Sequence, residues 1–484
     1  MSASQAQKSL AQTASKPNIL FILTDDMKQR DLSLEYMPNT QTLLADKGVE
    51  FTKAYVTRSL CCPSRASTLR GQYTHNHNVW VNVPPSGGFW NFYDQGHESS
   101  TIATSLDSAP GFVDGYDTVL IGKYLNRYGM DRNGNYAPDP HIPQGWDEWY
   151  AWEGNYSSDR TYDINENGQI VRYERSLKHD TDLHADQAVR FLTEHANDPE
   201  RKDIPFFMYL APNAPHKPAY YAPRHANMFT SEPLPKPQSF NEADVSDKPQ
   251  WVQNKPRLSS TKIEELTALN RDRLRALQSV DDMVGRLVDT LSVPDRVTGQ
   301  RPIDNTYIVF TSDNGVYLGE HRLEEKAAAY QAAPRVPLVI RGPGVPQGVT
   351  RSQMALNNDL ASTFAFWAGV TPPGFVDGRS LAPLLSASPP ASWRTAFLVE
   401  HRRTPEEFAY VRAIPNYDAV RTTQYSYVEY ETGEKELYDL TVDPQELTNI
   451  HKSASPALLS NLKNRLDALK SCTGAGCKVA EDGG

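Results

Sequence analysis

Short apolar runs that end in polar residues restrict the fold of this chain more than any other feature. Four of them stand along the first three quarters of the sequence: Asn18–Leu23, Thr118–Ile121, Pro205–Leu210 and Thr306–Phe310. Continuous apolar runs of this length predict strands that are covered on both faces, as in a sheet sandwiched by helices. Helical patterns lie between them, the clearest at Ile263–Leu291, where apolar residues recur at helical spacing. The chain is therefore predicted to be an α/β protein.

Polar side chains follow each of these runs, where the predicted strands end. They are Asp25, Asp26, Lys123, His216, Asp313 and Asn314. Open α/β sheets bind their ligands outside the carboxyl ends of the strands. We therefore expect these side chains, which are far apart in the sequence, to share one crevice.

The pattern changes from about Pro372. Alternating segments at Ala396–Glu400 and Tyr425–Tyr430 predict antiparallel strands, and Pro456–Leu469 predicts a terminal helix. The irregular, Pro-rich stretch 212–260 is long enough to be a substrate-facing loop. We expect three parts, which are a disordered or trimmed leader at 1–16, a main domain at 17–371 and a smaller α+β domain at 372–484.

Charge and cysteine usage narrow the functional class. The 49 Lys and Arg residues are outnumbered by 59 Asp and Glu residues, which gives a net charge of −10 and disfavours a nucleic-acid partner. No apolar stretch approaches the roughly 20 residues of a transmembrane segment. Cys472 and Cys477 stand in a Gly-containing turn that suits a disulfide, with zinc or free thiols as alternatives. A disulfide favours a secreted or periplasmic protein, and a cytoplasmic location is the alternative.

The segment from Ser59 to Gly71 combines a thiol with an anion-binding pattern. It places Cys61, a helix-starting Pro63-Ser64 pair and Arg65 at a predicted helix N-terminus. Backbone N–H groups and the helix dipole favour an anion there, and Arg65 adds a planar positive group. The same surroundings predict an acidified thiol at position 61.

This segment resembles the sulfatase signature Cys-x-Pro-Ser-Arg. The matching residues are Cys61, Pro63, Ser64, Arg65, Leu69 and Gly71, whereas Gln72 replaces the usual basic residue. In that family a formylglycine-generating enzyme oxidises the cysteine to Cα-formylglycine, whose hydrate supplies the attacking oxygen and later releases sulfate. The resemblance implies that Cys61 is the converted residue.

Further motifs in the same order extend the resemblance over nearly the whole chain. They are Asp25-Asp26, Gly122-Lys123, Asn213–His216, Ser312–Gly315 and Gly319–Lys326. The resemblance implies an alkaline-phosphatase-like fold whose main domain, 17–371, is catalytic. It also implies that Asp25, Asp26, Asp313 and Asn314, together with the converted Cys61, bind the metal ion. An oxygen-rich site suits a hard cation, with Ca²⁺ as first choice and Mg²⁺ as second.

The remaining roles follow from the charge of a sulfate ester. Arg65, Lys123 and Lys326 are expected to stabilise charge on the transferring group. His216 is expected to protonate the leaving alkoxide or to bind the sulfate. Many sulfatases carry a His after the Gly-Lys step, where this chain has Leu125 and Asn126. Asn126 is predicted to bind sulfate or hydroxyl, which leaves acid catalysis to His216 or a Lys.

Within the family, the motifs look most like the N-acetylglucosamine-6-sulfatase and heparan endosulfatase branch. The stretches concerned are Cys61–Arg65, Tyr73–Asn78 and Gly122–Asn126. The implied substrate is a sulfated sugar or an aryl sulfate. Because no basic groove is evident in so acidic a chain, a terminal residue or small ester is favoured over internal positions of a long glycan.

Two alternatives remain open at this point. The first is a phosphate or phosphonate ester hydrolase on the same fold, because phosphate and sulfate esters share tetrahedral geometry. The second is an inactive protein that binds sulfated glycans. Outside the motifs, His75, His77 and His401 are interpreted as polar surface or loop residues, and Asp281-Asp282 as a solvated helix face.

Overall fold

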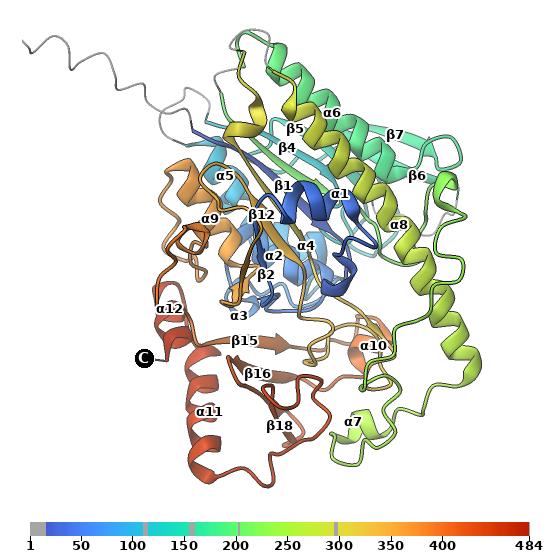
Figure 1. Cartoon of the computed structure of the whole chain (residues 1–484), viewed down its shortest axis with the longest axis vertical. Coiled ribbons are helices and arrows are strands. Elements are labelled where there is room, and N and C mark those ends of the chain that lie inside the picture. The colour runs from blue at the N-terminus through green and yellow to red at the C-terminus, as the bar shows by residue number, and fades with distance from the viewer. Residues whose placement is uncertain (1–15, 110–114, 154–159, 202–203, 295–298, 484) are drawn as a thin grey trace, which may run out of the picture.

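The computed structural model describes residues 16–109, 115–153, 160–201, 204–294 and 299–483. The predicted leader therefore lies outside the described residues, apart from Lys16. Figure 1 shows a large sheet between helices in the upper part of the molecule and a second, smaller sheet below it. None of the described helices is long and apolar enough to cross a lipid bilayer.

The large sheet has ten strands, and its centre is parallel. In spatial order the strands are β13 (Val349–Arg351), β2 (Val49–Phe51), β12 (Leu338–Arg341), β9 (Thr306–Ser312), β1 (Asn18–Thr24), β8 (Phe206–Ala211), β4 (Asp117–Gly122), β5 (Glu148–Glu153), β6 (Thr161–Glu166) and β7 (Gln169–Glu174). The five strands from β9 to β5 run parallel to one another. Strand β12 pairs antiparallel with β9, and β6 and β7 continue the other edge antiparallel. The four apolar runs are thus the four central neighbours β9, β1, β8 and β4.

Each face of this sheet is covered by helices, which explains the continuous apolar runs. Along β1, Ile19 and Phe21 belong to one buried cluster, whereas Leu20 and Ile22 belong to the other. The first face carries helices α2 (Cys61–Arg70), α4 (Gly88–Asp94), α5 (Ile102–Asp107) and α9 (Asp359–Ala368), and the second carries α6 (Asp180–Asn197) and α8 (Ser260–Ser292). A strand between two helical layers needs apolar side chains at every position. The predicted α/β class is confirmed.

The second sheet is antiparallel and contains only residues from the last fifth of the chain. Its strands, in order, are β15 (Ala396–His401), β16 (Tyr417–Thr422), β17 (Tyr425–Tyr430) and β18 (Lys435–Asp439). Helices α11 (Pro456–Leu469) and α12 (Ala475–Asp482) pack beside it (Figure 1). Cys472, in the connection after α11, and Cys477 on α12 form the predicted disulfide. The predicted antiparallel strands and terminal helix are confirmed.

The second sheet supports a segment that follows β11 (Glu324–Glu325) in the main body. The Tyr417 hydroxyl donates to the Ala327 carbonyl over 2.9 Å. The Tyr330 hydroxyl donates over 2.6 Å to Glu436, a buried carboxylate on β18. Lys326 stands at the start of this segment, so the small sheet helps to fix its backbone.

The prediction of a solvated face at Asp281-Asp282 is wrong for Asp281. Asp281 is 3% exposed, and its carboxylate accepts hydrogen bonds from the backbone N–H groups of Asn39 and Thr40 over 2.9 and 2.7 Å. It therefore caps the short helix α1 (Pro38–Thr40) from the neighbouring α8. Asp282, by contrast, is partly exposed and pairs with Arg224.

The surface interpretation is also wrong for two of the three histidines. His77 and His401 are fully buried, because helix α3 (Thr74–His77) and β15 lie where the two sheets meet. His77 shares a hydrogen bond with Ser67 on α2 over 2.9 Å. His75 is partly buried and contacts Glu400 on β15 over 3.1 Å.

Candidate active site

Helix α2 begins at Cys61, as the anion-binding pattern predicts. Pro63 lies in its first turn, where a missing backbone N–H costs no helical hydrogen bond. The backbone N–H of Cys62, which has no partner within the helix, donates to Asn82 Oδ1 over 2.9 Å. Gly71 ends the helix in the left-handed conformation, with φ 67°. Cys61 is therefore held rigidly at the buried start of a capped helix.

The acidic residues arrive from two neighbouring strands. Thr24 at the end of β1 is paired with Ser312 at the end of β9, so the residues that follow both strands emerge together. Asp26 has φ 67°, a left-handed conformation that Asp tolerates better than most residues. Its backbone N–H donates to Asp313 over 3.1 Å. These carboxylates therefore meet at the strand ends, as the sequence predicts.

Three cationic side chains bind these carboxylates. Lys123 Nζ lies 2.6 Å from Asp25 Oδ2. Arg65 Nε lies 2.8 Å from Asp313 Oδ2. Lys326 Nζ contacts Asp26 and lies 2.9 Å from Cys61 Sγ.

The charges of this cluster are buried and nearly balanced. All six charged groups are at most 2% exposed. Burial tends to raise the pKa of Asp25, but Lys123, His216 and Arg65 outweigh it and hold that pKa well below its ordinary value. Burial and the neighbouring Asp25 raise the pKa of Asp313 to about 6. Asp25 therefore remains an anion around neutral pH.

The expected acidification of the thiol is not found. Burial raises the pKa of Cys61 above its ordinary value, although Lys123 and Lys326 act in the opposite direction. Desolvation of a thiolate outweighs the helix dipole here, because every residue of α2 is buried. The unmodified Cys61 is a neutral thiol and a poor nucleophile.

The donor atoms fit a hard cation. Asp25, Asp26, Cys61 and His216 each offer a ligand atom within 4.8 Å of the others. Asn314 Oδ1 is buried and has no hydrogen-bond partner among the described residues, while its Nδ2 donates to Asp26 over 2.5 Å. A buried amide oxygen without a partner beside carboxylates is what a bound cation would satisfy.

The same cluster offers an unused donor for an anion. Arg65 Nη1 donates to the Lys123 carbonyl over 2.8 Å, whereas Nη2 is buried without a partner in the described parts of the chain. The Tyr209 hydroxyl on β8 is equally buried, and burial raises its pKa to about 12. Arg65 is thus fixed by two of its nitrogens, and Nη2, on the side of the buried Tyr209 hydroxyl, is the donor available to an oxyanion.

His216 faces the cluster from the loop after β8. Its Nε2 lies 3.6 Å from Asp26 Oδ2, and its Nδ1 lies 2.6 Å from the Lys217 carbonyl, to which it donates. Burial lowers its pKa, although Asp25 and Asp26 oppose this effect. The imidazole therefore presents Nε2 toward the site.

For Asn126, the structure shows neither an ion pair nor a side-chain hydrogen bond to the cluster among the described residues. Its carbonyl accepts the N–H of Phe89 over 2.8 Å. Its side-chain Oδ1 is buried and has no partner among the described residues. This oxygen is compatible with the predicted binding of a hydroxyl group, but no contact in the structure supports that role.

One supporting residue escaped the sequence analysis. Arg273 on α8 donates to the Asp26 carbonyl over 2.6 Å and to the Pro215 carbonyl over 3.0 Å. It therefore ties the carboxylate loop to the loop of His216. Its signal was an Arg at helical spacing from Leu266 and Leu277, within the apolar stripe of the helix.

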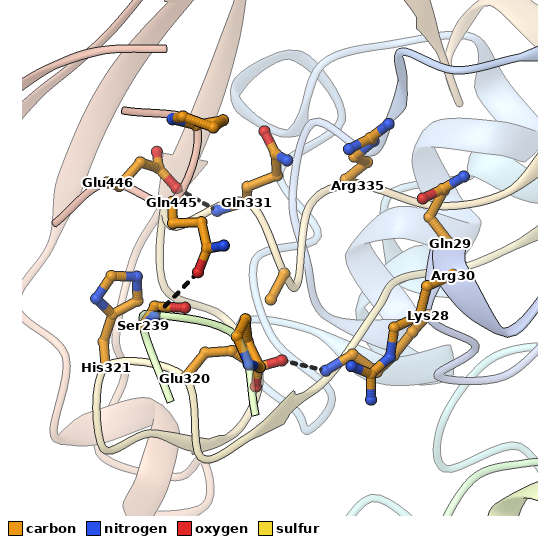
Figure 2. Close-up of a pocket in the computed structure, with 13 residues that line it drawn as sticks. Lys28, Gln29, Arg30, Ser239, Glu320, His321, Gln331, Arg335, Gln445 and Glu446 are labelled. Carbon is orange, nitrogen blue, oxygen red and sulfur yellow. Dashed lines mark hydrogen bonds and ion pairs between the residues drawn. The ribbon is translucent and has the colours of Figure 1, made fainter. Parts of the chain in front are cut away.

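A buried ion pair joins the segment after Asp26 to the segment before Lys326. Lys28 follows Asp26 by two positions, and Glu320 precedes Lys326 by six. Their side chains meet over 2.5 Å at the edge of a small cavity of about 190 Å³, where Figure 2 shows them pointing toward each other. Gln445, from the loop after β18, faces Ser239 across the same cavity. The pair positions the chain on both sides of the cluster.

Known proteins resemble this chain over most of its length. The family model described as Sulfatase matches residues 17–370, and one described as N-sulphoglucosamine sulphohydrolase, C-terminal, matches residues 319–472. N-acetylglucosamine-6-sulfatase of Homo sapiens is 33% identical over 496 residues, which cover 96% of this chain and 86% of that protein. The extracellular sulfatase SULF-1 homolog of Drosophila melanogaster is 38% identical over 82% of this chain and 34% of its own length.

Solved structures resemble the whole fold. A protein in complex with its substrate D-glucosamine-2-N,6-O-disulfate has a TM-score of 0.76 and 26% identity, covering 93% of this chain and 97% of that one. Phosphonate monoester hydrolase of Agrobacterium radiobacter has a TM-score of 0.70 at 23% identity and covers 94% and 96% of the two chains. The second likeness concerns the fold alone. The sheet, its helical layers and the first likeness confirm the predicted alkaline-phosphatase-like architecture.

Proposed function

Since the chain belongs to the sulfatase family and is a sulfuric ester hydrolase, we propose that its reaction takes place at Cys61 after conversion to Cα-formylglycine. The contacts of the Cys61 thiol support this assignment. Cys61 Sγ lies 2.9 Å from Lys326 Nζ and 3.6 Å from Asp25 Oδ1. A group at this position touches both a cation and a candidate metal ligand.

The basic side chains bind the sulfate group. Arg65 Nη2 donates to one sulfate oxygen, while Nε and Nη1 stay on Asp313 and the Lys123 carbonyl. Lys123 and Lys326 donate to further oxygens, because each ammonium has three donors. Together they neutralise the charge that would repel an attacking oxygen, in a pocket where water screens little.

His216 handles the proton of the leaving group. Its Nδ1 stays bonded to the Lys217 carbonyl, so only Nε2 faces the site. As an imidazolium, the form that Asp25 and Asp26 favour against burial, His216 carries a second proton at Nε2, which passes to the alkoxide as the sulfur–oxygen bond breaks and leaves the imidazole neutral. Once converted, residue 61 would hold the aldehyde hydrate whose oxygen attacks sulfur.

The metal-binding residues are Asp25, Asp26, Asp313 and Asn314, together with the converted residue 61. Ca²⁺ is the proposed ion and Mg²⁺ the second choice, because the oxygens come from two separate loops and suit flexible coordination. When bound, the cation neutralises sulfate charge and makes the hydrate a stronger nucleophile. The buried Oδ1 of Asn314, which has no hydrogen-bond partner in the described chain, supports this ligand set.

The maturation partner is a formylglycine-generating enzyme. Cys61 is 1% exposed and lies inside a helix whose residues are all buried. An enzyme cannot reach such a thiol in the folded protein, so conversion precedes folding. Incubating folded, unconverted protein with the enzyme is expected to leave it inactive, whereas treatment before refolding is expected to activate it.

The proposed substrate is a sulfated sugar, with aryl sulfates as artificial substrates. The similarity to N-acetylglucosamine-6-sulfatases supports a 6-O-sulfated glucosamine. The net charge of −10, which indicates no basic groove for a long glycan, supports a residue at a chain end. The disulfide Cys472–Cys477 supports a secreted or periplasmic location.

Paired rate measurements test the reaction class. We expect kcat/KM for 4-nitrophenyl sulfate to exceed that for 4-nitrophenyl phosphate, with Cys61→Ala abolishing both. The opposite preference in converted protein would assign the chain to the phosphate and phosphonate ester hydrolases that share its fold. Binding of sulfated glycans without turnover would instead support the non-enzymatic alternative.

A further inference from the structure

A polar cavity of about 520 Å³ lies at the β7 edge of the large sheet. It is lined by Tyr150 on β5, Tyr173 on β7 and Gln187 on α6, together with the turn between β6 and β7. Figure 1 shows these elements in the upper part of the molecule, away from the second sheet. Among the described residues that line the cavity, none belongs to the cluster around Cys61. Its volume is that of a small-molecule site.

Gln187 brings a buried acceptor without a partner to this cavity. The residue is 6% exposed, and its Nε2 donates to Glu166 over 3.0 Å. Its Oε1 is buried and has no hydrogen-bond partner among the described residues. Buried amide oxygens are rarely left unsatisfied in folded proteins, so Oε1 is the atom that a donor on a ligand would bind.

The two tyrosines of the lining are held in fixed orientations. The Tyr150 hydroxyl accepts a hydrogen bond from Asn167 Nδ2 over 3.0 Å. The Tyr173 hydroxyl donates to Glu166 over 2.6 Å, and its ring stacks on that of Tyr162 at an interplanar angle of 17°. Rings that are already fixed lose little conformational freedom when a ligand packs on them.

The charges of the lining suit a neutral ligand. Asp186 pairs with Lys178 and Arg286, which lie outside the lining. The other two charged residues that line the cavity are Glu166, an anion, and Arg190, a cation. Hydroxyl groups donate to carboxylates and accept from guanidinium and amide N–H groups, so a ligand rich in hydroxyls matches this lining.

We propose that this cavity is a second binding site, separate from the reaction centre, which takes a neutral pyranose ring of a glycan. The apolar face of the ring packs on Tyr173, one hydroxyl donates to Gln187 Oε1, and another donates to Glu166. Asn167 and Gln169 in the lining are exposed, so the cavity is accessible from solvent. The choice of a sugar rests on the proposed function, and the site raises the affinity for a glycan without taking part in hydrolysis.

The first test measures binding of N-acetylglucosamine by titration calorimetry. For Gln187→Leu we expect Kd to rise about ten-fold, because the ring loses one buried hydrogen bond. Gln278→Leu is the matched control, since Gln278 is also 6% exposed but lies on α8, outside the lining. No binding by the wild type, an unchanged Kd in Gln187→Leu, or an equal rise in the control would overturn the proposal.

A second variant tests the aromatic contact. We expect Tyr173→Ala, at a partly exposed position on the edge strand, to raise Kd about ten-fold as well. Tyr93→Ala is its control, because Tyr93 is 43% exposed on α4, outside the lining. An unchanged Kd in Tyr173→Ala would overturn the proposed stacking and with it the site.

Kinetics separate this site from the reaction centre. All four variants are expected to keep the wild-type kcat/KM for 4-nitrophenyl sulfate. Competitive inhibition of this reaction by N-acetylglucosamine, with an inhibition constant equal to the measured Kd, would place the ring at the reaction centre and overturn the proposal. A protein that binds the sugar as expected but does not hydrolyse 4-nitrophenyl sulfate would support the second site and refute the proposed reaction at Cys61.

Discussion

Replacing Arg65 by Lys tests whether the guanidinium binds the sulfate group, because the change keeps the positive charge and removes the planar arrangement of three nitrogens. The guanidinium binds Asp313 through Nε and the Lys123 carbonyl through Nη1, both over 2.8 Å, and leaves Nη2 for the sulfate. A lysine has one nitrogen at a different depth and cannot make all three contacts. Loss of one such contact in a transition state costs about 10²–10³ in rate, or about 3–4 kcal/mol.

The assay must separate catalysis from folding and maturation. Activity is measured as kcat/KM for 4-nitrophenyl sulfate and divided by the fraction of formylglycine at position 61, because Arg65 belongs to the signature motif. Arg394→Lys is the matched control, since Arg394 is 2% exposed and its carboxylate partners Asp359 and Glu481 lie outside the site. We expect this control to lose stability and to keep its normalised activity.

The expected result for Arg65→Lys is a fall of at least about 100-fold in normalised kcat/KM. A folded, converted Arg65→Lys protein within three-fold of the wild type would refute the reasoning that Nη2 binds the transferring group. An equal fall in Arg394→Lys would show that loss of a buried Arg acts through folding alone.

Three further predictions concern the metal, the ion pair behind the site and a buried histidine. Exhaustive chelation is expected to abolish turnover, with Ca²⁺ restoring it better than Zn²⁺; undiminished turnover would contradict the oxygen-rich metal site. Glu320→Gln removes the carboxylate that lies 2.5 Å from the buried Lys28 ammonium. The free energy of unfolding, measured by urea titration, should therefore fall by about 1–3 kcal/mol. An unchanged value would contradict the positioning role of this ion pair. Burial opposes the charge of His75, but its hydrogen bond to Glu400 prevails and raises its pKa from 6.5 to about 9. The positive charge of His75 therefore contributes its full stability below pH 6.5, and this contribution is lost as the pH rises through about 9. Over that range the difference in unfolding free energy between wild type and His75→Gln should shrink by up to about 3 kcal/mol. A difference that stays constant with pH would contradict this prediction.

The sequence predicted the site because parallel strands carry their polar ends to one edge. Residues 24 and 312 are paired neighbours in the sheet, so Asp25 and Asp313 meet although the chain between them is long. The signature motif predicted the start of α2 at Cys61 for a local reason, since its first turn tolerates Pro63.

What the sequence could not predict depends on contacts between distant segments. The thiol at position 61 was expected to be acidic from its helix terminus, but the whole helix is buried and desolvation prevails. The sequence around His77 indicates a polar surface or loop residue, whereas its burial depends on packing where the two sheets meet. A cavity of about 500 Å³ is lined by both Lys255 and Phe408, and neither segment carries a pattern that indicates the other.

The chemical state of residue 61 is the most direct test of the account. We expect the peptide that contains this residue to show an aldehyde in the mass spectrum of active protein, while Cys62 beside it remains a thiol. Activity per molecule should then rise in proportion to the aldehyde fraction across preparations. Full activity in protein whose Cys61 is entirely unmodified would contradict the central claim.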